Sequence, residues 1–389
     1  MSWQQVKLGD IFEIARGGSP RPIDQYITDD PNGLNWISIK DASNSSKYIY
    51  KTEKKIKPEG LHKTRLVHPD DFLLTNSMSF GRPYIMKTTG CIHDGWLVLR
   101  ADKSKVDTDY FYHLLGSDFI YRKFVGLAAG AVVKNLNTDL VKSVTVPLPP
   151  INEQRRIASI LDKADELRQK RQQAIEKLYQ LLQATFLDMF GDPVSNPKGW
   201  EISTLGEQCE VGTGSTPSRQ NADYFEGNIP WVKSTEVDWG TITYTSETIS
   251  ENGKNSARLK IYPKGSIILA LYGQGITRGK SALLGIEATL NQACAALITK
   301  GSVNNYFVFS FLRFSYENLR NQARGGNQEN LNLNIVKNFP IYLPPENLQE
   351  KWSKIALSIQ DQKQKLYKQL DIQSNLFNSL QKQEFSGNL

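Results

Sequence analysis

Pro149-Pro150-Ile151-Asn152-Glu153-Gln154 opens a stretch that runs without glycine or proline to Phe190, and Gly191-Asp192-Pro193 ends it. This stretch predicts a single long α-helix, because glycine and proline are the residues that interrupt helices. Its apolar residues recur at alternating steps of three and four, which is typical of a coiled-coil seam. Such a helix needs a partner helix, and at about 1.5 Å per residue it spans roughly 60 Å.

A partner helix is predicted near the C-terminus. A second stretch begins with Pro344-Pro345-Glu346-Asn347-Leu348-Gln349, and after Pro345 the chain contains no glycine or proline before Gly387. Both stretches begin with the pattern Pro-Pro-x-Asn-x-Gln, 195 residues apart, so we expect the two helices to pair with each other. The expected seam consists of Ile157, Ile160, Leu167, Leu178 and Leu181 on the first helix and Trp352, Ile355, Ile359, Leu366, Leu376 and Leu380 on the second.

The duplication runs through the rest of the chain. The matching pairs are Trp3 with Trp200, Leu8-Gly9 with Leu205-Gly206, Gly17-Gly18-Ser19-Pro20 with Gly214-Ser215-Thr216-Pro217, Trp36 with Trp231, Gly81 with Gly275, and Leu136-Asn137 with Leu331-Asn332. A repeat of this length predicts two globular domains rather than a solenoid. The expected parts are a first domain (1–148), a first long helix (149–190), a linker (191–199), a second domain (200–343) and a second long helix (344–389).

Each domain has the pattern of an α+β fold. Short strands are predicted at 36–39, 72–74 and 96–99, and their counterparts at 230–232, 267–269 and 295–298. A helix is expected from Asp109 to Val125 with Phe119 on its core-facing stripe, and another near Tyr306 to Gln322. Asn152 is a candidate N-cap for the first long helix.

Composition restricts the class of protein. The 389 residues carry a formal net charge of +7, which favours a polyanionic partner. The three cysteines, Cys91, Cys209 and Cys294, are odd in number and widely spaced, so a reducing compartment is expected. No apolar run approaches about 18 residues, so we expect a cytoplasmic protein without a membrane segment.

Catalytic motifs are not found. The four histidines (His62, His68, His93 and His113) all fall in the first repeat, so the duplicated parts cannot share a metal site or a catalytic triad. Gly212-Thr213-Gly214 is weak as a nucleotide-binding loop, because its counterpart Arg16-Gly17-Gly18 does not keep the pattern. Leu148-Pro149-Pro150-Ile151 lacks the polar and aromatic residues that an adenine methyltransferase loop needs. We therefore predict no catalytic, cofactor-binding or metal-binding residue in this chain.

Polar loops rich in glycine are the remaining candidates for function. Arginine, lysine, asparagine and glutamine in such loops can bind phosphates and base edges, although ordinary surface loops have the same composition. Arginine next to glycine at both Arg82 and Arg278 favours function. The candidate DNA-binding residues are Arg16, Ser19, Arg21, Lys40, Asn76, Ser77, Ser79, Arg82, Ser215, Arg219, Lys233, Tyr272, Gln274, Thr277, Arg278, Lys280, Arg324, Asn327 and Gln328.

The order of these parts, with Leu-Pro-Pro-Ile-Asn-Glu-Gln-Arg-Arg-Ile-Ala-Ser-Ile-Leu-Asp-Lys-Ala-Asp at 148–165 and Met-Phe-Gly-Asp-Pro at 189–193, resembles the specificity subunit of type I restriction-modification systems. The resemblance spans the whole chain. It implies two target recognition domains, each reading one half of a bipartite double-stranded DNA sequence. It also implies that the helices pair antiparallel as a coiled coil with pseudo-two-fold symmetry, set the gap between the half-sites and dock two methyltransferase subunits.

Further implications concern the partners. The complex would be an adenine-N6 methyltransferase and, with restriction subunits, an endonuclease; this chain would be its non-catalytic DNA-binding subunit. S-adenosylmethionine would bind the methyltransferase subunit, ATP and magnesium the restriction subunit, and no cofactor this chain. One departure from the family is that Glu350-Lys351-Trp352-Ser353 stands where the first helix has Arg155-Arg156-Ile157-Ala158.

Two other classes of function stay open at this point. An enzyme acting alone would bind S-adenosylmethionine or a metal ion as an isolated chain. A scaffold that binds proteins would lack the steep salt dependence that phosphate contacts give to DNA binding.

Overall fold

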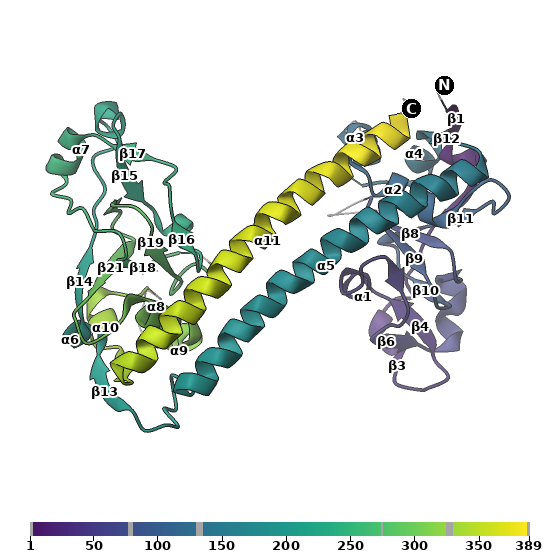
Figure 1. The fold of residues 1–389 in the computed structure, drawn as a ribbon. Coiled ribbons are helices and arrows are strands. Elements are labelled where there is room, and N and C mark those ends of the chain that lie inside the picture. The colour runs from purple at the N-terminus through teal and green to yellow at the C-terminus, as the bar shows by residue number, and fades with distance from the viewer. Residues whose placement is uncertain (1–2, 77–80, 130–134, 274, 324–329, 387–389) are drawn as a thin grey trace. The chain divides into compact units, whose positions relative to one another are not determined.

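The computed structural model describes residues 3–76, 81–129, 135–273, 275–323 and 330–386. The chain forms two compact units: unit 1 consists of Met1–Gln172 and Lys368–Leu389, and unit 2 of Gln173–Tyr367. Two long helices, α5 (Ile151–Phe190) and α11 (Glu346–Ser386), each begin in one unit and end in the other. They confirm the two helices that the glycine- and proline-free stretches predict (Figure 1).

Unit 1 combines two five-stranded sheets with short helices. Its strands are β1 (Gln4–Lys7), β2 (Phe12–Arg16), β3 (Ile27–Thr28), β4 (Leu34–Ile37), β5 (Tyr48–Ile49), β6 (Lys54–Ile56), β7 (Arg65–Val67), β8 (Phe72–Thr75), β9 (Pro83–Met86), β10 (Gly90–Ile92), β11 (Trp96–Ala101) and β12 (Thr145–Leu148). Its helices are α1 (Ile39–Ser43), α2 (Thr108–Leu115), α3 (Asp118–Ala129) and α4 (Thr138–Ser143), with 3₁₀ turns η1 (Leu8–Asp10), η2 (Ile23–Gln25) and η3 (Pro58–Lys63). The sheets have the orders β2-β11-β8-β9-β5 and β3-β6-β4-β10-β7, and β1 pairs with β12.

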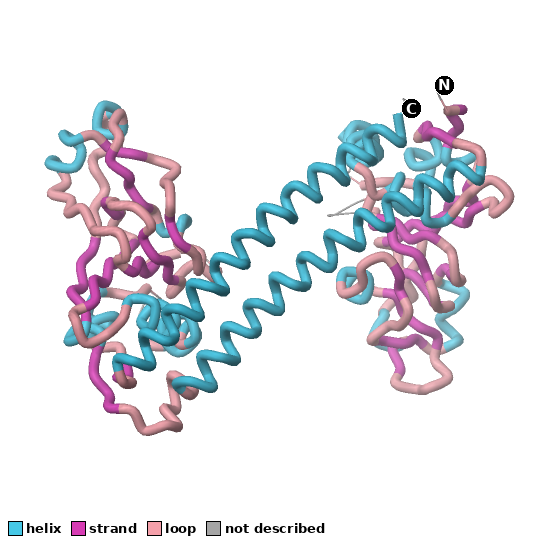
Figure 2. Tube along the Cα trace, in the orientation of Figure 1, coloured by secondary structure: helices cyan, strands magenta, loops and turns pink. Residues whose placement is uncertain are grey.

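Unit 2 repeats this plan. Its strands are β13 (Glu201–Thr204), β14 (Cys209–Thr213), β15 (Ile229–Val232), β16 (Thr241–Ile242), β17 (Thr248–Ile249), β18 (Ile267–Ala270), β19 (Ser281–Leu284), β20 (Thr289–Leu290), β21 (Cys294–Thr299) and β22 (Pro340–Leu343). Its helices are α6 (Leu205–Gln208), α7 (Glu251–Ser256), α8 (Asn305–Phe314), α9 (Tyr316–Asn321) and α10 (Leu333–Lys337), with η4 (Ala222–Phe225) and η5 (Ser234–Glu236). The sheets have the orders β14-β21-β18-β19-β16 and β17-β15-β20, and β13 pairs with β22. Figure 2 shows the strands gathered in the two globular parts.

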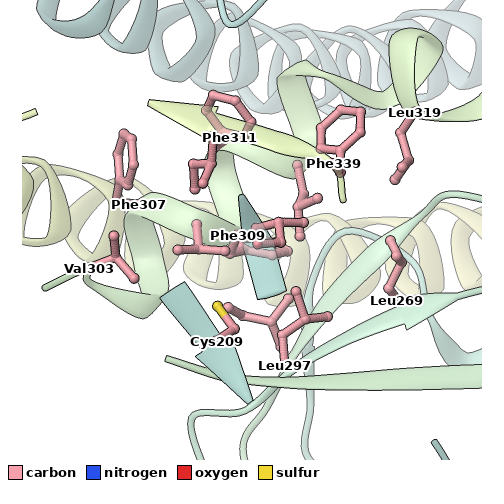
Figure 3. Packing of buried hydrophobic residues seen from close by; sticks show 14 of the residues in the cluster. Cys209, Leu269, Leu297, Val303, Phe307, Phe309, Phe311, Leu319 and Phe339 are labelled. Carbon is pink, nitrogen blue, oxygen red and sulfur yellow. The ribbon is translucent and has the colours of Figure 1, made fainter. Parts of the chain in front are cut away.

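The central sheet of each unit is buried on both faces. On β11, Leu97 and Leu99 face a core shared with the helices, whereas Val98 faces a second core shared with the other sheet. Side chains alternate along a strand, so one strand serves both cores. In unit 2, the helix-side core places Phe307, Phe311 and Phe339 close to strand residues such as Leu297 (Figure 3).

The helix expected after the central strands is in fact two helices in each unit. In unit 1, α2 ends at Leu115 and α3 starts at Asp118; in unit 2, α8 ends at Phe314 and α9 starts at Tyr316. Gly116 and Ser117 separate α2 from α3, and the Ser117 hydroxyl donates a hydrogen bond back to the Leu114 carbonyl. The break changes which face is buried, so Phe119 is 43% exposed and the prediction that it lies in the core is wrong.

A buried glutamine fixes the start of each long helix. Gln154 accepts a hydrogen bond from the Asp107 amide (2.8 Å) and donates two, to the carbonyls of Lys105 (2.8 Å) and Pro149 (2.9 Å). Gln349 makes the same three bonds in unit 2, to the Asn304 amide (2.8 Å) and the carbonyls of Ser302 (3.4 Å) and Pro344 (2.8 Å). The shared Pro-Pro-x-Asn-x-Gln pattern is therefore a repeated joint between domain and helix.

The same geometry corrects the expected N-cap. Asn152 is the second residue of α5 and is exposed, so it does not cap the helix. The Pro150 carbonyl instead accepts hydrogen bonds from the amides of Glu153 and Gln154.

A tryptophan at the start of each domain fixes the end of a long helix. The indole of Trp3 donates to the Glu384 carbonyl near the end of α11 (3.1 Å), and the indole of Trp200 donates to the Phe190 carbonyl at the end of α5 (2.9 Å). Each unit therefore holds the beginning of one long helix and the end of the other.

Within each unit α5 and α11 run side by side in opposite directions (Figure 1). In unit 1, Arg156 pairs with Glu384 (2.9 Å) and the Arg168 guanidinium lies 4.5 Å from the Phe377 ring centroid. In unit 2, the Trp352 ring lies 5.2 Å from that of Phe186. Residue numbers rise on one helix as they fall on the other, which defines an antiparallel pair.

The buried stripe of the helices differs from the expected seam. Ile157, Trp352 and Ile359 are buried, and Ile160, Leu178, Ile355, Leu366 and Leu380 are partly buried. Leu167, Leu181 and Leu376 are 55%, 52% and 56% exposed, so their assignment to a seam is wrong. The buried apolar residues of α5 are instead Ile157, Ala158, Leu161, Ile175, Leu182, Phe186 and Phe190. Most of these pack on the domain cores, because each helix half packs against a globular core as well as against the other helix.

Charged groups also join α5 to unit 1. Asp162 accepts a hydrogen bond from Lys47 (2.9 Å) and lies 2.8 Å from the His113 ring, while Lys47 also pairs with Asp109 (2.7 Å). Partial burial opposes ionisation of Asp162, but the contacts with His113 and Lys47 outweigh it and hold the pKa of this carboxyl below its usual range.

No helix in the described part of the chain is long and apolar enough to cross a membrane. The three cysteines are free and buried.

Candidate nucleic-acid interface

Three loops of unit 1 meet at one edge of its central sheet. In the antiparallel register, Arg16 at the end of β2 is opposite Leu97, and Trp96 at the start of β11 is opposite Thr75 at the end of β8. The residues that directly follow β2 and β8, and those that directly precede β11, therefore lie next to one another. The described parts of these segments and the strand ends beside them contain the candidate residues Arg16, Ser19, Arg21, Asn76 and Arg82.

Asp94 connects these loops. Its carboxylate accepts hydrogen bonds from the Ser19 hydroxyl (3.0 Å) and from Arg21 (3.3 Å). Its carbonyl accepts from Arg16 (3.0 Å) and from the buried amide of Asn76 (2.7 Å). Partial burial opposes ionisation, but hydrogen bonds from Ser19 and the backbone and the nearby charges lower the pKa of this carboxyl. Asp94 thus orders a group of cations.

More cations border the same edge. Arg65 donates to the Arg16 carbonyl (3.4 Å), and the Lys63 amine donates to the Tyr26 hydroxyl (3.1 Å). All of these side chains except Tyr26 are exposed, so the edge presents positive charge to solvent.

The glycine turns are required by close backbone contacts. A Cβ on Gly17 would lie 2.1 Å from the His93 carbonyl oxygen, and a Cβ on Gly214 would lie 1.8 Å from that of Leu290. Both distances are far below van der Waals contact. The matched glycines therefore bring the turn after the first strand against the loop before the last strand in both units.

Unit 2 repeats the edge with different side chains. Thr213 ends β14 opposite Ala295, and Ala270 ends β18 opposite Cys294. Trp36 pairs with Cys91 in unit 1, and its counterpart Trp231 pairs with Thr289 in unit 2, so Cys91 and Thr289 are equivalent. Three residues further along the chain, Asp94 is therefore equivalent to Gln292. The Thr216 hydroxyl hydrogen-bonds to Gln292, as Ser19 does to Asp94. Equivalent loops with unequal side chains are suited to reading two different sequences.

A second basic group in unit 2 surrounds Glu247. Arg219 and Lys233 pair with its two carboxylate oxygens at 2.7 Å and 2.6 Å. Hydrogen bonds from Lys233 and Arg219 outweigh burial and lower the pKa of Glu247. The Arg219 guanidinium also stacks 4.1 Å from the Phe225 ring centroid. Ser215 contributes its backbone to this region, since its amide donates to Leu290 and its carbonyl accepts from the Trp231 indole.

In the loops after β8 and β18, the structure shows that Arg82 and Arg278 do not occupy equivalent positions. The Gly81 amide donates a hydrogen bond to the Thr75 carbonyl, and Gly81 has a φ of 83°. The equivalent glycine of unit 2 is Gly279, not Gly275, because the Gly279 amide donates to the Ala270 carbonyl and Gly279 has a φ of 86°. Arg82 therefore corresponds to Lys280. Arg82 is exposed, whereas Arg278 is only 7% exposed.

The remaining candidates divide into three groups. Tyr272 is 39% exposed and Thr277 is half-buried, while Lys280 pairs with Asp238 (2.7 Å). Lys40 lies on α1 and pairs with Glu53 (2.8 Å), away from the register positions of the three loops. Outside the described residues lie Ser77, Ser79, Gln274, Arg324, Asn327 and Gln328.

Sequence reasoning missed Asp94, Gln292, Lys63 and Arg65. An acidic residue is not an expected DNA contact, and Lys63 and Arg65 lie far from the glycine turn in sequence. Within the described ranges, no group of three or more His, Cys, Asp or Glu residues could hold a metal ion.

The family model described as type I restriction modification DNA specificity domain matches residues 1–177 and again residues 197–373. The chain belongs to this family. It is a DNA-recognition subunit with two DNA specificity domains, and the relatives named below are specificity subunits of type I restriction enzymes.

Named relatives agree with this assignment. The chain is 25% identical over 379 residues to the type I restriction enzyme MjaIX specificity subunit of Methanocaldococcus jannaschii, covering 91% of this chain and 86% of the relative. It is 24% identical over 155 residues to the EcoR124I/EcoR124II specificity subunit of Escherichia coli, covering 39% and 38% of the two chains.

The fold of a specificity subunit is also found in solved structures. The S subunit from M. genitalium aligns with a TM-score of 0.60 at 17% identity, covering 98% of this chain and 96% of that one. A chain from a structure of a type I restriction-modification system aligns with a TM-score of 0.59 at 18% identity, covering 100% and 98%.

Proposed function

We propose that this specificity subunit determines which DNA sequence a type I restriction-modification complex recognises. Each domain would read one half of a bipartite target. The observation that carries the proposal is the repeated loop edge, in which equivalent backbone positions hold Ser19 and Asp94 in unit 1 but Thr216 and Gln292 in unit 2. Two similar frames with unlike side chains would read two unlike half-sites.

The proposed domains are those expected from the repeat: 1–148 and 200–343 for target recognition, 149–190 and 344–389 for the helices and 191–199 for the linker. Candidate contacts in the described loops are Arg16, Ser19, Arg21, Arg82, Arg219, Lys233, Tyr272, Thr277 and Lys280. The antiparallel helices would set the gap between half-sites and dock two methyltransferase subunits. The buried Trp352 and Ser353 take the places of Ile157 and Ala158, which supports a similar helix start in both units.

The chemistry would belong to the partners. Methyltransferase subunits would bind S-adenosylmethionine and modify adenine at N6, restriction subunits would use ATP and magnesium, and the complex would act in the cytoplasm on double-stranded DNA. This chain would hold none of these cofactors.

A methylation map tests the proposal. The chain is expressed with the methyltransferase subunit encoded beside it, and modified bases are mapped across the host genome. We expect modified adenine in an interrupted sequence with two unlike halves, and exchange of residues 1–148 should change one half only. An assembled, cofactor-binding complex that modifies no site would contradict the proposal.

A further inference from the structure

Unit 2 contains a polar cavity that the loop edge does not use. It has a volume of about 140 Å³ and lies between α8, α11, the residues before β16 and one turn of α5. Its polar lining includes Arg313, Gln360, Lys363, Thr241 and Tyr367. None of the candidate DNA-binding residues lines it.

Two cations face this cavity beside aromatic rings. The Arg313 guanidinium lies 4.5 Å from the centroid of the Tyr179 ring, and the Lys363 amine lies 5.9 Å from the same centroid. Arg313 donates a long hydrogen bond (3.4 Å) to the Trp239 carbonyl, but its buried Nε has no hydrogen-bond partner in the described part of the chain. Trp239 itself has φ of 57°, a conformation that is rare for a bulky residue.

Neither charge has an ion-pair partner in the described part of the unit, although the Asp238 carboxylate attracts the Arg313 charge from beyond ion-pair distance. Across the described ranges, no carboxylate forms an ion pair with Arg313 or Lys363, and the nearby Asp238 pairs with Lys280 (2.7 Å). Burial lowers the pKa of Arg313. Burial and the charge of Arg313 together lower the pKa of Lys363. Both side chains are half-buried, and a partly desolvated charge gains from an opposite charge beside it, so this arrangement is suited to an anion from outside.

Unit 1 shows what is missing. The two long helices align at a distance of 195 residues, so Arg168 corresponds to Lys363 and Asp165 to Gln360. Asp165 pairs with Arg168 at 3.6 Å, whereas Gln360 donates its amide to the Thr241 hydroxyl at 2.6 Å. The unit 1 cavity around Arg168 also includes Asp118 and Asp165. Unit 1 supplies its own carboxylates at this place, and unit 2 does not.

We propose that the unit 2 cavity binds the carboxylate of an acidic side chain from a protein partner. The aromatic walls favour a protein partner over a DNA phosphate, because aromatic residues and arginine are enriched at protein interfaces. Leu181, Leu357 and Tyr367, which are 52%, 44% and 51% exposed, lie on the same two helices and offer apolar contact area. The choice of partner rests on the proposed function, in which a methyltransferase subunit docks on the helices.

The first test uses the full chain alone. Its melting temperature is measured in sodium acetate and in sodium phosphate, with chloride replaced to keep the ionic strength constant. We expect either anion to raise the melting temperature, because a ligand that binds only the folded state stabilises it. Gln360→Asp should raise the melting temperature without added anion and abolish the response, since it places a carboxylate three residues before Lys363. Lys363→Met should also remove the response.

Lys365→Met is the matched control on the same helix. Lys365 is exposed and pairs with Asp361 (2.7 Å), so this variant should respond to anions as the unchanged chain does. An equal response in all four proteins would identify an adventitious ion only and overturn the proposal. So would a fall in melting temperature for Gln360→Asp, since that would show that no anion is needed there.

The second test identifies the source of the carboxylate. Affinity for the methyltransferase subunit is measured with the unchanged chain, Lys363→Met and Lys365→Met; we expect only Lys363→Met to weaken binding, by about tenfold or more. Binding of a 20-base-pair duplex should keep its salt dependence in Lys363→Met. A salt slope reduced by about one would assign the site to a DNA phosphate and overturn the protein-partner proposal. If the unchanged chain does not bind the methyltransferase subunit, the proposed function fails, while the anion response of the isolated chain is judged separately.

Discussion

Replacing Gln154 with leucine tests whether the repeated glutamine joint holds each long helix to its domain. Gln154 is fully buried, and leucine has a similar volume, so the change leaves little empty space. It removes three hydrogen bonds and leaves the Asp107 amide and the carbonyls of Lys105 and Pro149 without this partner. At roughly 1 kcal/mol for each buried group, unit 1 should lose about 3 kcal/mol of unfolding free energy.

The assay is urea unfolding of the full chain followed by tryptophan fluorescence, with the free energy taken by linear extrapolation. Gln349→Leu should lower the stability of unit 2 by slightly less, because one of its three hydrogen bonds is long (3.4 Å). Gln169→Leu is the control: Gln169 is exposed on α5, and its side-chain amide makes an exposed hydrogen bond to Asp165 of the same helix (2.7 Å), so a change within about 0.5 kcal/mol is expected. A loss below about 1 kcal/mol for both buried variants would refute the assigned role.

Three further outcomes are expected. Gly17→Ala should destabilise the chain by about 1–3 kcal/mol, because its Cβ would collide with the His93 carbonyl. Gly126→Ala in α3 should instead stabilise it by about 0.5–1 kcal/mol, because the added Cβ would meet no described atom within 4 Å beyond the backbone of its own helix. Thermal unfolding measures both effects, and equal effects would contradict the contact argument. Asp162→Asn should destabilise the chain most near neutral pH and progressively less as the pH falls through and below 3.8, because a carboxyl with a lowered pKa stabilises the fold only while it is ionised. Unfolding free energies of both proteins are measured across this pH range. A loss of stability that does not change with pH would exclude this role. Arg16→Ala should weaken DNA binding and reduce the slope of log affinity against log salt by about one, without changing the melting temperature; an unchanged slope would remove Arg16 from the phosphate contacts.

The sequence allowed the large-scale plan of the molecule to be predicted because the repeat is visible in residues with strict structural roles. Gln154 and Gln349 are buried between backbone groups, Asn137 and Asn332 cap α4 and α10, and the matched glycines approach carbonyl oxygens closely. Few other residue types can fill these roles, so the equivalent positions of the two repeats have the same residue.

Other features depend on contacts that a local pattern does not contain. The seam prediction placed Leu167 and Leu181 between the helices, but the buried stripe is set by two domain cores as well as by the partner helix. The separation of α2 from α3 depends on Ser117, whose hydroxyl donates a hydrogen bond to the Leu114 carbonyl in the last turn of α2. At the loop edge, the role of Asp94 follows from strand register, which brings together residues that are distant in the chain.

The division of the long helices between the units has a consequence for how the chain folds during synthesis. Phe377 and Phe385, near the end of α11, belong to the same core as Leu97 of unit 1, and Trp3 bonds to Glu384. The first domain emerges from the ribosome early, yet it cannot complete its core until the last residues have been made. Unit 2 (Gln173–Tyr367) is continuous and has all its residues before then. We expect unit 2 to complete its native core first and unit 1 to complete its core last. Truncation of the chain before Phe377 would therefore chiefly destabilise the N-terminal domain, at the opposite end of the sequence.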